Sequence, residues 1–96
     1  MLEHKILKTG GKTLEAIRFK IGTKNLIVIK GRHGYVMCGY LNLKTADKFN
    51  EAAVVVNGVS TISGMIKARA FAVSSCAKKL GIRKNQPIQD VLKIIA

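Results

Sequence analysis

The chain has 96 residues, of which 48% are hydrophobic and only 5% aromatic, and it carries 17 Lys or Arg against 5 Asp or Glu. A chain of this length buries one modest core, so we expect residues 1–96 to form a single domain. It lacks an apolar window long enough for a transmembrane helix, and its first residues carry charges where a signal peptide needs an apolar stretch. We therefore expect a cytoplasmic protein without a membrane partner.

The net charge of +12 predicts attraction to nucleic acid or to acidic partners. The lysines are scattered, however, and no run of five or more like charges occurs. Few aromatic side chains are available to stack on bases, and no nucleic-acid-binding motif is present, so base-specific recognition has no support. Nonspecific nucleic-acid binding and simple solubility both remain open as roles for the charge.

The first half of the chain is typical of β-strands. Two extended runs flank Gly10-Gly11, a pair that supplies the positive φ angles of a tight hairpin. In the second run Ile17, Phe19 and Ile21 alternate with two basic residues, which predicts one buried face and one solvated face.

A second predicted hairpin follows. The continuous apolar run Asn25–Lys30 favours a central strand covered on both sides. After the short connection Gly31–Gly34, the run that ends at Leu41 predicts the strand that pairs with it.

The second half changes character. Residues 42–52 predict a short helix with Leu43, Ala46 and Phe49 on one side. Residues 52–56 are too rich in β-branched side chains for a helix and predict a buried strand, which Asn57-Gly58 closes.

Three helices are predicted after that strand. Ser60 or Thr61 caps the first, and a break is expected near Ala68, where its apolar stripe is interrupted. The second and third have helix-spaced apolar stripes. The stripe of the second helix consists of Val73, Cys76, Ala77 and Leu80. Pro87 opens the third at the first helical position, where its missing N–H costs nothing, and the stripe of this helix is Ile88, Val91, Leu92 and Ile95.

Strands followed by helices indicate an α+β fold with a mixed or antiparallel sheet and helices packed mainly on one face. The strand at 35–41 should place Cys38 on one face and Met37 and Gly39 on the other. A glycine inside a strand leaves space for the close approach of a ligand or backbone.

Cys38 is the candidate catalytic thiol. A reactive cysteine needs nearby positive charge, which Arg32 and His33 would supply if the loop folds back or a neighbouring chain contributes. On this hypothesis Cys38 is the more reactive of the two thiols. The alternative is that Cys38 is a packed hydrophobe, as free cysteines commonly are.

The remaining candidate binding residues are Arg32, His33, Gly39 and Asn42. Glycines on both sides of Arg32-His33 allow consecutive amides to form an anion-binding nest, although a plain hairpin turn explains the same residues. Cys76 lies on a predicted helix stripe, so we interpret it as a core residue.

Metal and cofactor chemistry has no motif in this sequence. There are two cysteines far apart and two histidines, and there is no Walker loop, Rossmann fingerprint or catalytic triad order. We expect no metal and no cofactor, and whether the protein is an enzyme stays open.

The segment Asn25–Asn42 resembles the YunC-like family of small bacterial and archaeal domains of unknown function. The resemblance rests on Asn25-Leu26, on the strand Gly34–Gly39 with its Met-Cys-Gly ending, and on Leu41-Asn42. The segments Val54–Ala68 and Ala77–Ile82 are also similar to the family, whereas Asn85-Gln86-Pro87 departs from it. The resemblance implies a two-layer α/β sandwich, and it brings no known activity or cofactor.

Three functions therefore remain open. The first is a site for a small anionic ligand, or a thiol-dependent site, around Cys38. The second is a basic module that binds nucleic acid nonspecifically. The third is an assembly protein without a catalytic site that forms a homo-oligomer through a sheet edge or a helix face.

Overall fold

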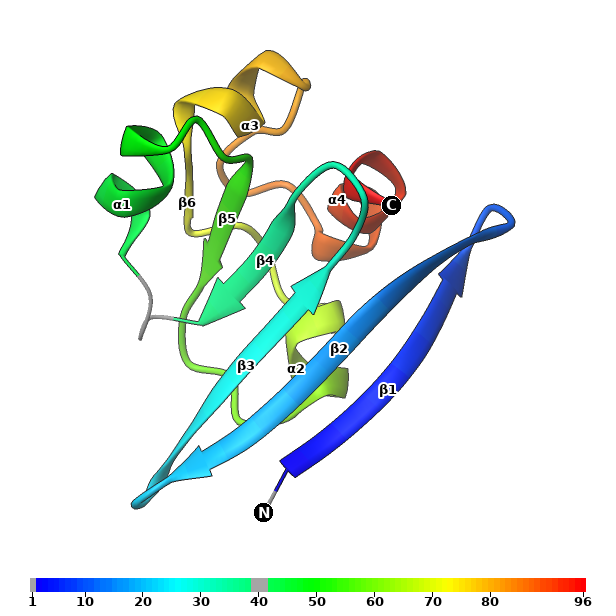
Figure 1. The fold of residues 1–96 in the computed structure, drawn as a ribbon, viewed down its shortest axis with the longest axis vertical. Helices are drawn as coiled ribbons and strands as arrows, with labels where there is room; N and C mark the ends of the chain where they lie inside the picture. The colour runs from blue at the N-terminus through cyan, green and yellow to red at the C-terminus, as the bar shows by residue number, and fades with distance from the viewer. Residues whose placement is uncertain (1, 39–41) are drawn as a thin grey trace.

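The computed structural model describes residues 2–38 and 42–96, which form a sheet and four short helices (Figure 1). The strands are β1 (Leu2–Thr9), β2 (Lys12–Ile21), β3 (Lys24–Lys30), β4 (Tyr35–Cys38), β5 (Ala53–Val56) and β6 (Ala72–Val73). The helices are α1 (Leu43–Lys48), α2 (Ile62–Lys67), α3 (Ser75–Lys79) and α4 (Ile88–Ile95).

The described strands form one sheet in the order β1-β2-β3-β4-β5-β6. All neighbouring strands are antiparallel except β4 and β5, which are parallel. A parallel pair needs a crossover connection, and the chain between β4 and β5, which includes α1, provides it. The predicted α+β fold with a mixed sheet is confirmed.

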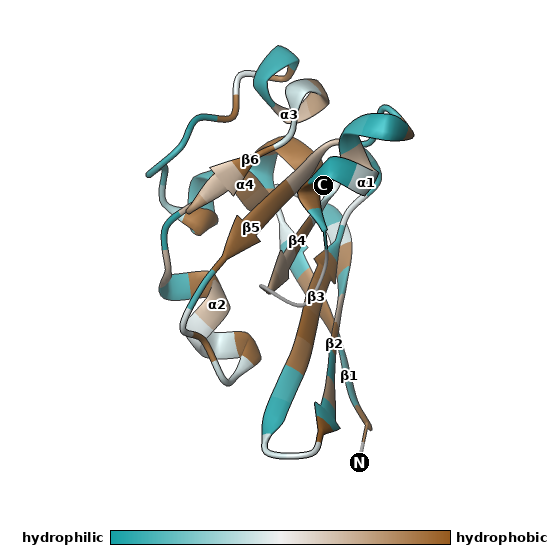
Figure 2. Cartoon of the chain, turned by 90° about the vertical axis from the view of Figure 1, so that its left-hand side faces the viewer, coloured by the Kyte–Doolittle hydropathy of each residue, from teal (hydrophilic) through white to brown (hydrophobic). Residues whose placement is uncertain are grey.

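The helices lie in two unequal layers, which Figure 2 shows on either side of the sheet. The larger core lies between one sheet face and α2, α3 and α4, and it includes the fully buried Ile27, Ile29 and Val54. A smaller cluster of Met37, Ala46, Ala53 and Val55 lies beneath α1 on the opposite face. Helices therefore pack mainly on one face, as predicted.

The predicted hairpins are confirmed, and the end of α2 and the start of α4 agree with the prediction to within one residue. Gly10 and Gly11 both have positive φ and join β1 to β2, and β3 pairs antiparallel with β4. Helix α2 ends at Lys67, one residue before the expected break. Pro87 is the N-cap of α4, and the apolar stripe of α4 is buried.

The prediction for β2 is wrong in phase. Leu14 and Ala16 are the buried residues of this strand, and the two-residue period then places Ile17, Phe19 and Ile21 on the opposite face. Helices do not cover that face along β1–β3, so Phe19 is 44% exposed. The expectation that β3 is covered on both sides fails for the same reason, because Leu26 and Val28 are only half-buried.

The predicted helix through Val73 and Leu80 is also wrong in part. Val73 belongs to β6, and the Ser74 hydroxyl accepts the Ala77 N–H to begin α3 only after it. Leu80 is consequently exposed, and Cys76 is half-buried at the edge of the core instead of inside it. Phe49, expected on the apolar side of α1, is 63% exposed.

Across residues 2–38 and 42–96, every helix is too short or too polar to span a bilayer.

Candidate functional site

Cys38 ends β4 and fills a gap between two strands. The ladder between β3 and β4 stops at Val28 and Met37, whereas the ladder between β4 and β5 continues to Cys38. The Cys38 Sγ accepts the N–H of Ile27 at 3.5 Å, and the thiol donates to the carbonyl oxygen of Asn25 at 3.7 Å. The sulfur thus replaces the backbone bonds that a continued ladder would make, and Cys38 is only 5% exposed.

A cleft of about 460 Å³ opens where β3 and β4 part. It is formed by the turn between β2 and β3, the ends of β4 and β5, and the connection from β5 to α2. Its lining residues are Thr23, Lys24, Asn25, Cys38, Val56, Asn57, Gly58, Val59 and Ser60. We call this the Cys38 cleft. Its lining contains one cation and no acidic side chain, so it suits a polar or anionic molecule.

Asn25 leaves a hydrogen-bonding group unused in the wall of the cleft. Among residues 2–38 and 42–96, its Oδ1 is the buried side-chain oxygen or nitrogen atom without a hydrogen-bond partner. A buried acceptor without a donor costs about 1–3 kcal/mol, so a bound molecule that donates a hydrogen bond would gain from it.

The cleft is bordered by the start of α2, where Thr61 and not Ser60 is the cap. The Thr61 Oγ1 accepts the N–H of Gly64 at 2.9 Å. The chain enters this turn through Gly58, whose φ of +73° a side chain would strain. Ser60 is thereby left exposed on the cleft side of the cap.

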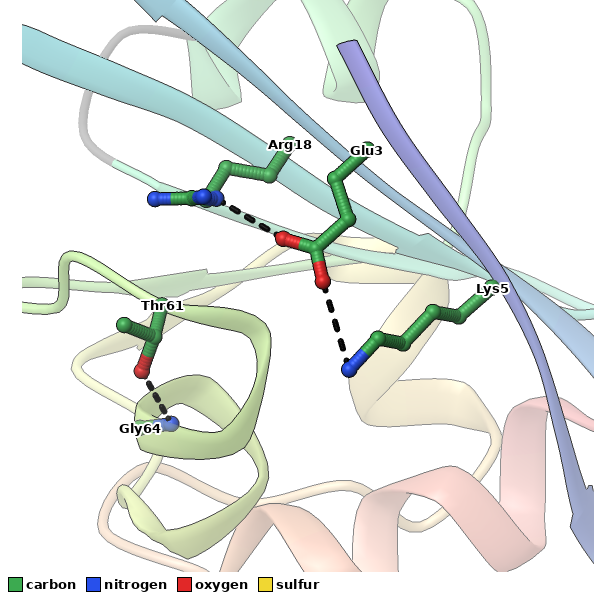
Figure 3. Close-up of polar contacts among 5 residues, drawn as sticks. All are labelled: Glu3, Lys5, Arg18, Thr61 and Gly64. Atoms are coloured by element: carbon green, nitrogen blue, oxygen red, sulfur yellow. Dashed lines mark hydrogen bonds and ion pairs between the residues drawn. The ribbon is translucent and has the colours of Figure 1, made fainter.

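An ion-pair network lies beside α2 on the helix-covered face of β1 and β2 (Figure 3). The Glu3 carboxylate accepts from Arg18 Nε at 2.9 Å and pairs with Lys5 Nζ at 3.2 Å. The Lys5 and Arg18 hydrogen bonds lower the pKa of Glu3. Glu3, one of the five acidic residues, therefore neutralises two strand cations instead of serving a cleft.

Arg32 and His33 lie at the opposite end of β4 from Cys38. The strand between them rises about 3.3 Å per residue, which keeps their positions more than about 10 Å from the thiol. The structure therefore does not bring Cys38 together with the two cations that were predicted to activate it. Their side chains are exposed beside a separate, smaller cleft of about 260 Å³ that Cys76 also lines.

The glycines around Arg32-His33 serve packing. The Gly31 N–H donates to Gly34 O, and the His33 N–H donates to Ile95 O at the end of α4, both at 2.8 Å. A Cβ on Gly31 would overlap the Ile95 carbonyl. These two amides are committed to the chain itself, which argues against the predicted anion nest.

Asn42 does not line the Cys38 cleft. The Asn42 side chain accepts the N–H of Lys44 at 2.8 Å and begins α1, on the other face of the sheet from Cys38. Gly39 lies outside the described residues.

Sequence reasoning missed the polar residues that surround Cys38, chiefly Lys24, Asn57 and Ser60. The sequence contains one signal that could have pointed to these residues: two turns, Gly22-Thr23 and Asn57-Gly58, each follow an apolar strand. Only the parallel pairing of β4 with β5 brings the second of these turns beside the thiol, and no local pattern predicts that pairing.

Tyr35 has the one strongly perturbed ionisation among the described residues. Its hydroxyl donates to Glu51 Oε1 at 3.0 Å. Partial burial, together with this hydrogen bond and the Glu51 charge, raises the pKa of Tyr35 to about 12. It lies at the Arg32 end of β4, away from the Cys38 cleft. In the described parts of the chain, no three His, Cys, Asp or Glu side chains gather as metal ligands.

Comparison with known proteins places this geometry in a family. The model for the domain of unknown function DUF1805 matches residues 37–95, which include Cys38 and the connection from β5 to α2. The uncharacterized protein YunC of Bacillus subtilis is 31% identical over 86 residues, covering 85% of each chain.

A solved structure agrees over the whole chain. The crystal structure of a protein of unknown function from Thermoplasma acidophilum has a TM-score of 0.96 and 34% identity, covering 100% of this chain and 94% of the other. The sheet and the helices are thus those of a recurring fold. The chain belongs to the DUF1805 family, to which the YunC-like resemblance had pointed.

Proposed function

We propose that the Cys38 cleft binds a small anionic molecule, such as a carboxylate or phosphate compound. The observation that carries the proposal is a cleft in which Lys24 is the one charged lining residue among the described residues; the unsatisfied Asn25 Oδ1 in its wall favours an anion that also carries a hydrogen-bond donor, such as a hydroxyl group. Asn57 and Ser60 add neutral hydrogen-bonding groups, and Val56 and Val59 add an apolar surface.

The position in the fold supports the same proposal. Ligands of open α/β sheets bind beyond the carboxyl ends of the strands, and the cleft lies at those ends of β4 and β5. Cys38 acts here as a wall residue that holds the parted strands. The protein as a whole is strongly cationic, which raises the local concentration of small anions.

Thermal unfolding in the presence of small anions at constant ionic strength tests this. We expect a carboxylate or phosphate compound to raise the unfolding temperature, because binding to the folded state alone stabilises it. Lys24→Gln should abolish the shift. Lys12→Gln is the matched control, because Lys12 is exposed beside the Gly10-Gly11 turn and its loss changes the net charge equally.

Two results would contradict the proposal: no anion raises the unfolding temperature, or both variants weaken the effect equally. Alkylation of Cys38 provides a second readout. A molecule bound in the cleft should slow modification of Cys38 and leave that of Cys76 unchanged. If the bound molecule instead becomes covalently attached to Cys38, the site is thiol-dependent.

A second candidate function is self-assembly through the open face of β1–β3. By register, Leu2, Phe19 and Leu26 lie side by side across the three strands, with Ile21 next to them. Leu2 is 62% exposed and Phe19 44%. Contiguous exposed apolar patches of a few hundred Å² mark interaction surfaces, and we propose a second copy of the chain as the occupant.

Light scattering on the eluting protein checks this assembly. A dimer should form, and it should strengthen with salt, because two chains of charge +12 repel each other and salt screens the repulsion. Phe19→Gln should weaken it, whereas Phe49→Gln, which removes an exposed phenylalanine from α1, should not. A monomer at high protein and high salt concentration would contradict it.

A further inference from the structure

A second cleft, separate from the Cys38 cleft, lies against the edge strand β6. It has a volume of about 610 Å³ and lies between β6 and the chain that follows α3. It shares no lining residue with the Cys38 cleft. The lining residues are Phe71, Ala72, Val73, Lys78, Gly81, Ile82, Arg83 and Lys84. We call it the Phe71 cleft.

The Phe71 cleft combines an apolar lining with an exposed aromatic ring. Val73 and Ile82 are buried and form its apolar lining, whereas Phe71 is 55% exposed. The backbone N–H of Phe71 is bonded to Val55 O at 2.8 Å, so the residue is anchored to the sheet while its ring remains accessible. An aromatic ring held in this way offers a stacking surface for another planar group.

The charged groups of the cleft all have one sign. Lys78, Arg83 and Lys84 line it, and no acidic residue does. Within residues 2–38 and 42–96, the ion pairs involve Glu3 and Glu15 only, so none neutralises these three cations. The Lys84 Nζ lies over one face of the Phe71 ring, 6.0 Å from its centre. A single small molecule is therefore large enough to contact both the Lys84 ammonium group and the Phe71 ring.

We propose that the Phe71 cleft binds a nucleoside phosphate unit, as a free nucleotide or within a single-stranded nucleic acid. The base stacks on Phe71, and the phosphate lies among Lys78, Arg83 and Lys84. Arginine is suited to this role, because its planar guanidinium contacts two phosphate oxygens at once. Stacking on an aromatic side chain together with backbone neutralisation is how proteins hold single strands without reading sequence.

The first experiment compares three ligands at constant ionic strength by calorimetry. Adenosine monophosphate has both the base and the phosphate, ribose 5-phosphate lacks the base, and adenosine lacks the phosphate. We expect the nucleotide to bind at least about 10-fold more tightly than either fragment, since it alone uses both the ring and the cations. Equal affinity for ribose 5-phosphate would overturn the proposal.

Two pairs of variants separate stacking from charge. Phe71→Leu keeps an apolar side chain but removes the ring, and it should weaken nucleotide binding about 5- to 100-fold while leaving ribose 5-phosphate unchanged. Phe49→Leu is its control. Arg83→Gln should weaken both phosphate ligands more than Lys12→Gln does. No effect of Phe71→Leu, or equal effects of Arg83→Gln and Lys12→Gln, would overturn the assignment.

Two further measurements show where the nucleotide binds and whether the ligand is a free nucleotide or a single-stranded nucleic acid. Amide chemical shifts should change at Phe71 and Ile82 on adding the nucleotide; changes confined to Lys24 and Asn57 would place binding in the Cys38 cleft and overturn this proposal alone. A labelled oligothymidine that competes with the nucleotide and is weakened by Phe71→Leu identifies single strands as a source, and no competition identifies the free nucleotide.

Discussion

Cys38 and Cys76 hold different positions, and this difference determines their expected chemistry. Cys38 is buried and uses its sulfur in two hydrogen bonds, whereas Cys76 is half-buried beside the smaller cleft near Arg32. From the structure we expect Cys76 to react first with a thiol reagent, the opposite of the order that the sequence predicts. Mass spectrometry of the partly labelled native protein gives the order directly.

Removing the Cys38 sulfur should be more costly than removing that of Cys76. Cys38→Val keeps an apolar side chain but leaves the buried N–H of Ile27 without its acceptor, so we expect a loss of about 1–3 kcal/mol in the free energy of unfolding. Cys76→Val, the control, should change it by less than about 1 kcal/mol. Urea denaturation measures both, and equal losses would show that the sulfur bonds do not stabilise the strands.

Protonated Tyr35 contributes a term to the free energy of unfolding that is lost at alkaline pH. The pKa of Tyr35 is raised from 10.0 in the unfolded chain to about 12 in the folded one, so the unfolded state releases this proton first. The term is therefore fully present below pH 10 and disappears as the pH rises toward 12.

Tyr35→Phe tests this term. The unfolding free energy of the native protein should fall more steeply between those pH values than that of the variant. In a titration of tyrosinate absorbance, the native protein should show a step near pH 12 that the variant lacks. A variant that instead loses a step near pH 10 would contradict the raised pKa of Tyr35.

At the scale of elements, α2 depends on its N-cap residue, Thr61. Thr61→Ala removes the acceptor of the Gly64 N–H and should destabilise the protein by about 1 kcal/mol. Ser60→Ala deletes a neighbouring hydroxyl that is not the cap and should have little effect on the unfolding temperature. If the two variants lose equal stability, the cap bond is not what stabilises α2.

Elements with a complete local signal could be predicted from the sequence. The Gly10-Gly11 turn and the start of α4 next to Pro87 depend on the backbone chemistry of one or two residues, and the break after Lys67 follows from the interrupted apolar stripe. The prediction that Val73 lies in a helix was wrong, because a buried strand residue just before a helix is as hydrophobic as a buried residue in the first turn of a helix. The prediction that Phe19 lies on a buried face was wrong. Alternating apolar and polar residues show that the two faces of a strand differ, but they do not show which face the helices cover.

The candidate site depended on contacts between distant parts of the sequence. Cys38 was identified from its strand, but Lys24 and Asn57 reach it only through the pairing of β3, β4 and β5. The apparent helpers Arg32 and His33 were close in sequence and lie at the wrong end of the strand. The spacing of residues in the sequence therefore singled out Cys38 as a candidate but predicted the wrong neighbours for it.

At the scale of the whole molecule, we propose that the charge of +12 gives weak, nonspecific binding to nucleic acid. Such binding releases counterions, so affinity for a random duplex should fall steeply between low and physiological salt. Fluorescence anisotropy at several salt concentrations measures the slope. Affinity that hardly changes with salt, or a strong preference for one sequence, would contradict a purely electrostatic contact.

The parting of β3 from β4 divides the protein into two blocks. The strands β1, β2 and β3 pair over long ladders, whereas among the described residues β3 pairs with β4 from Val28 to Lys30. Amide hydrogen exchange should therefore reveal two cooperative units, with β1–β3 opening at a lower free energy than β4, β5 and the helices. Such opening would begin at Cys38, where a sulfur atom replaces a carbonyl oxygen as the acceptor of the Ile27 N–H. The Ile27 amide should therefore exchange before the Ile29 amide. The Cys38 cleft would widen each time the two blocks separate.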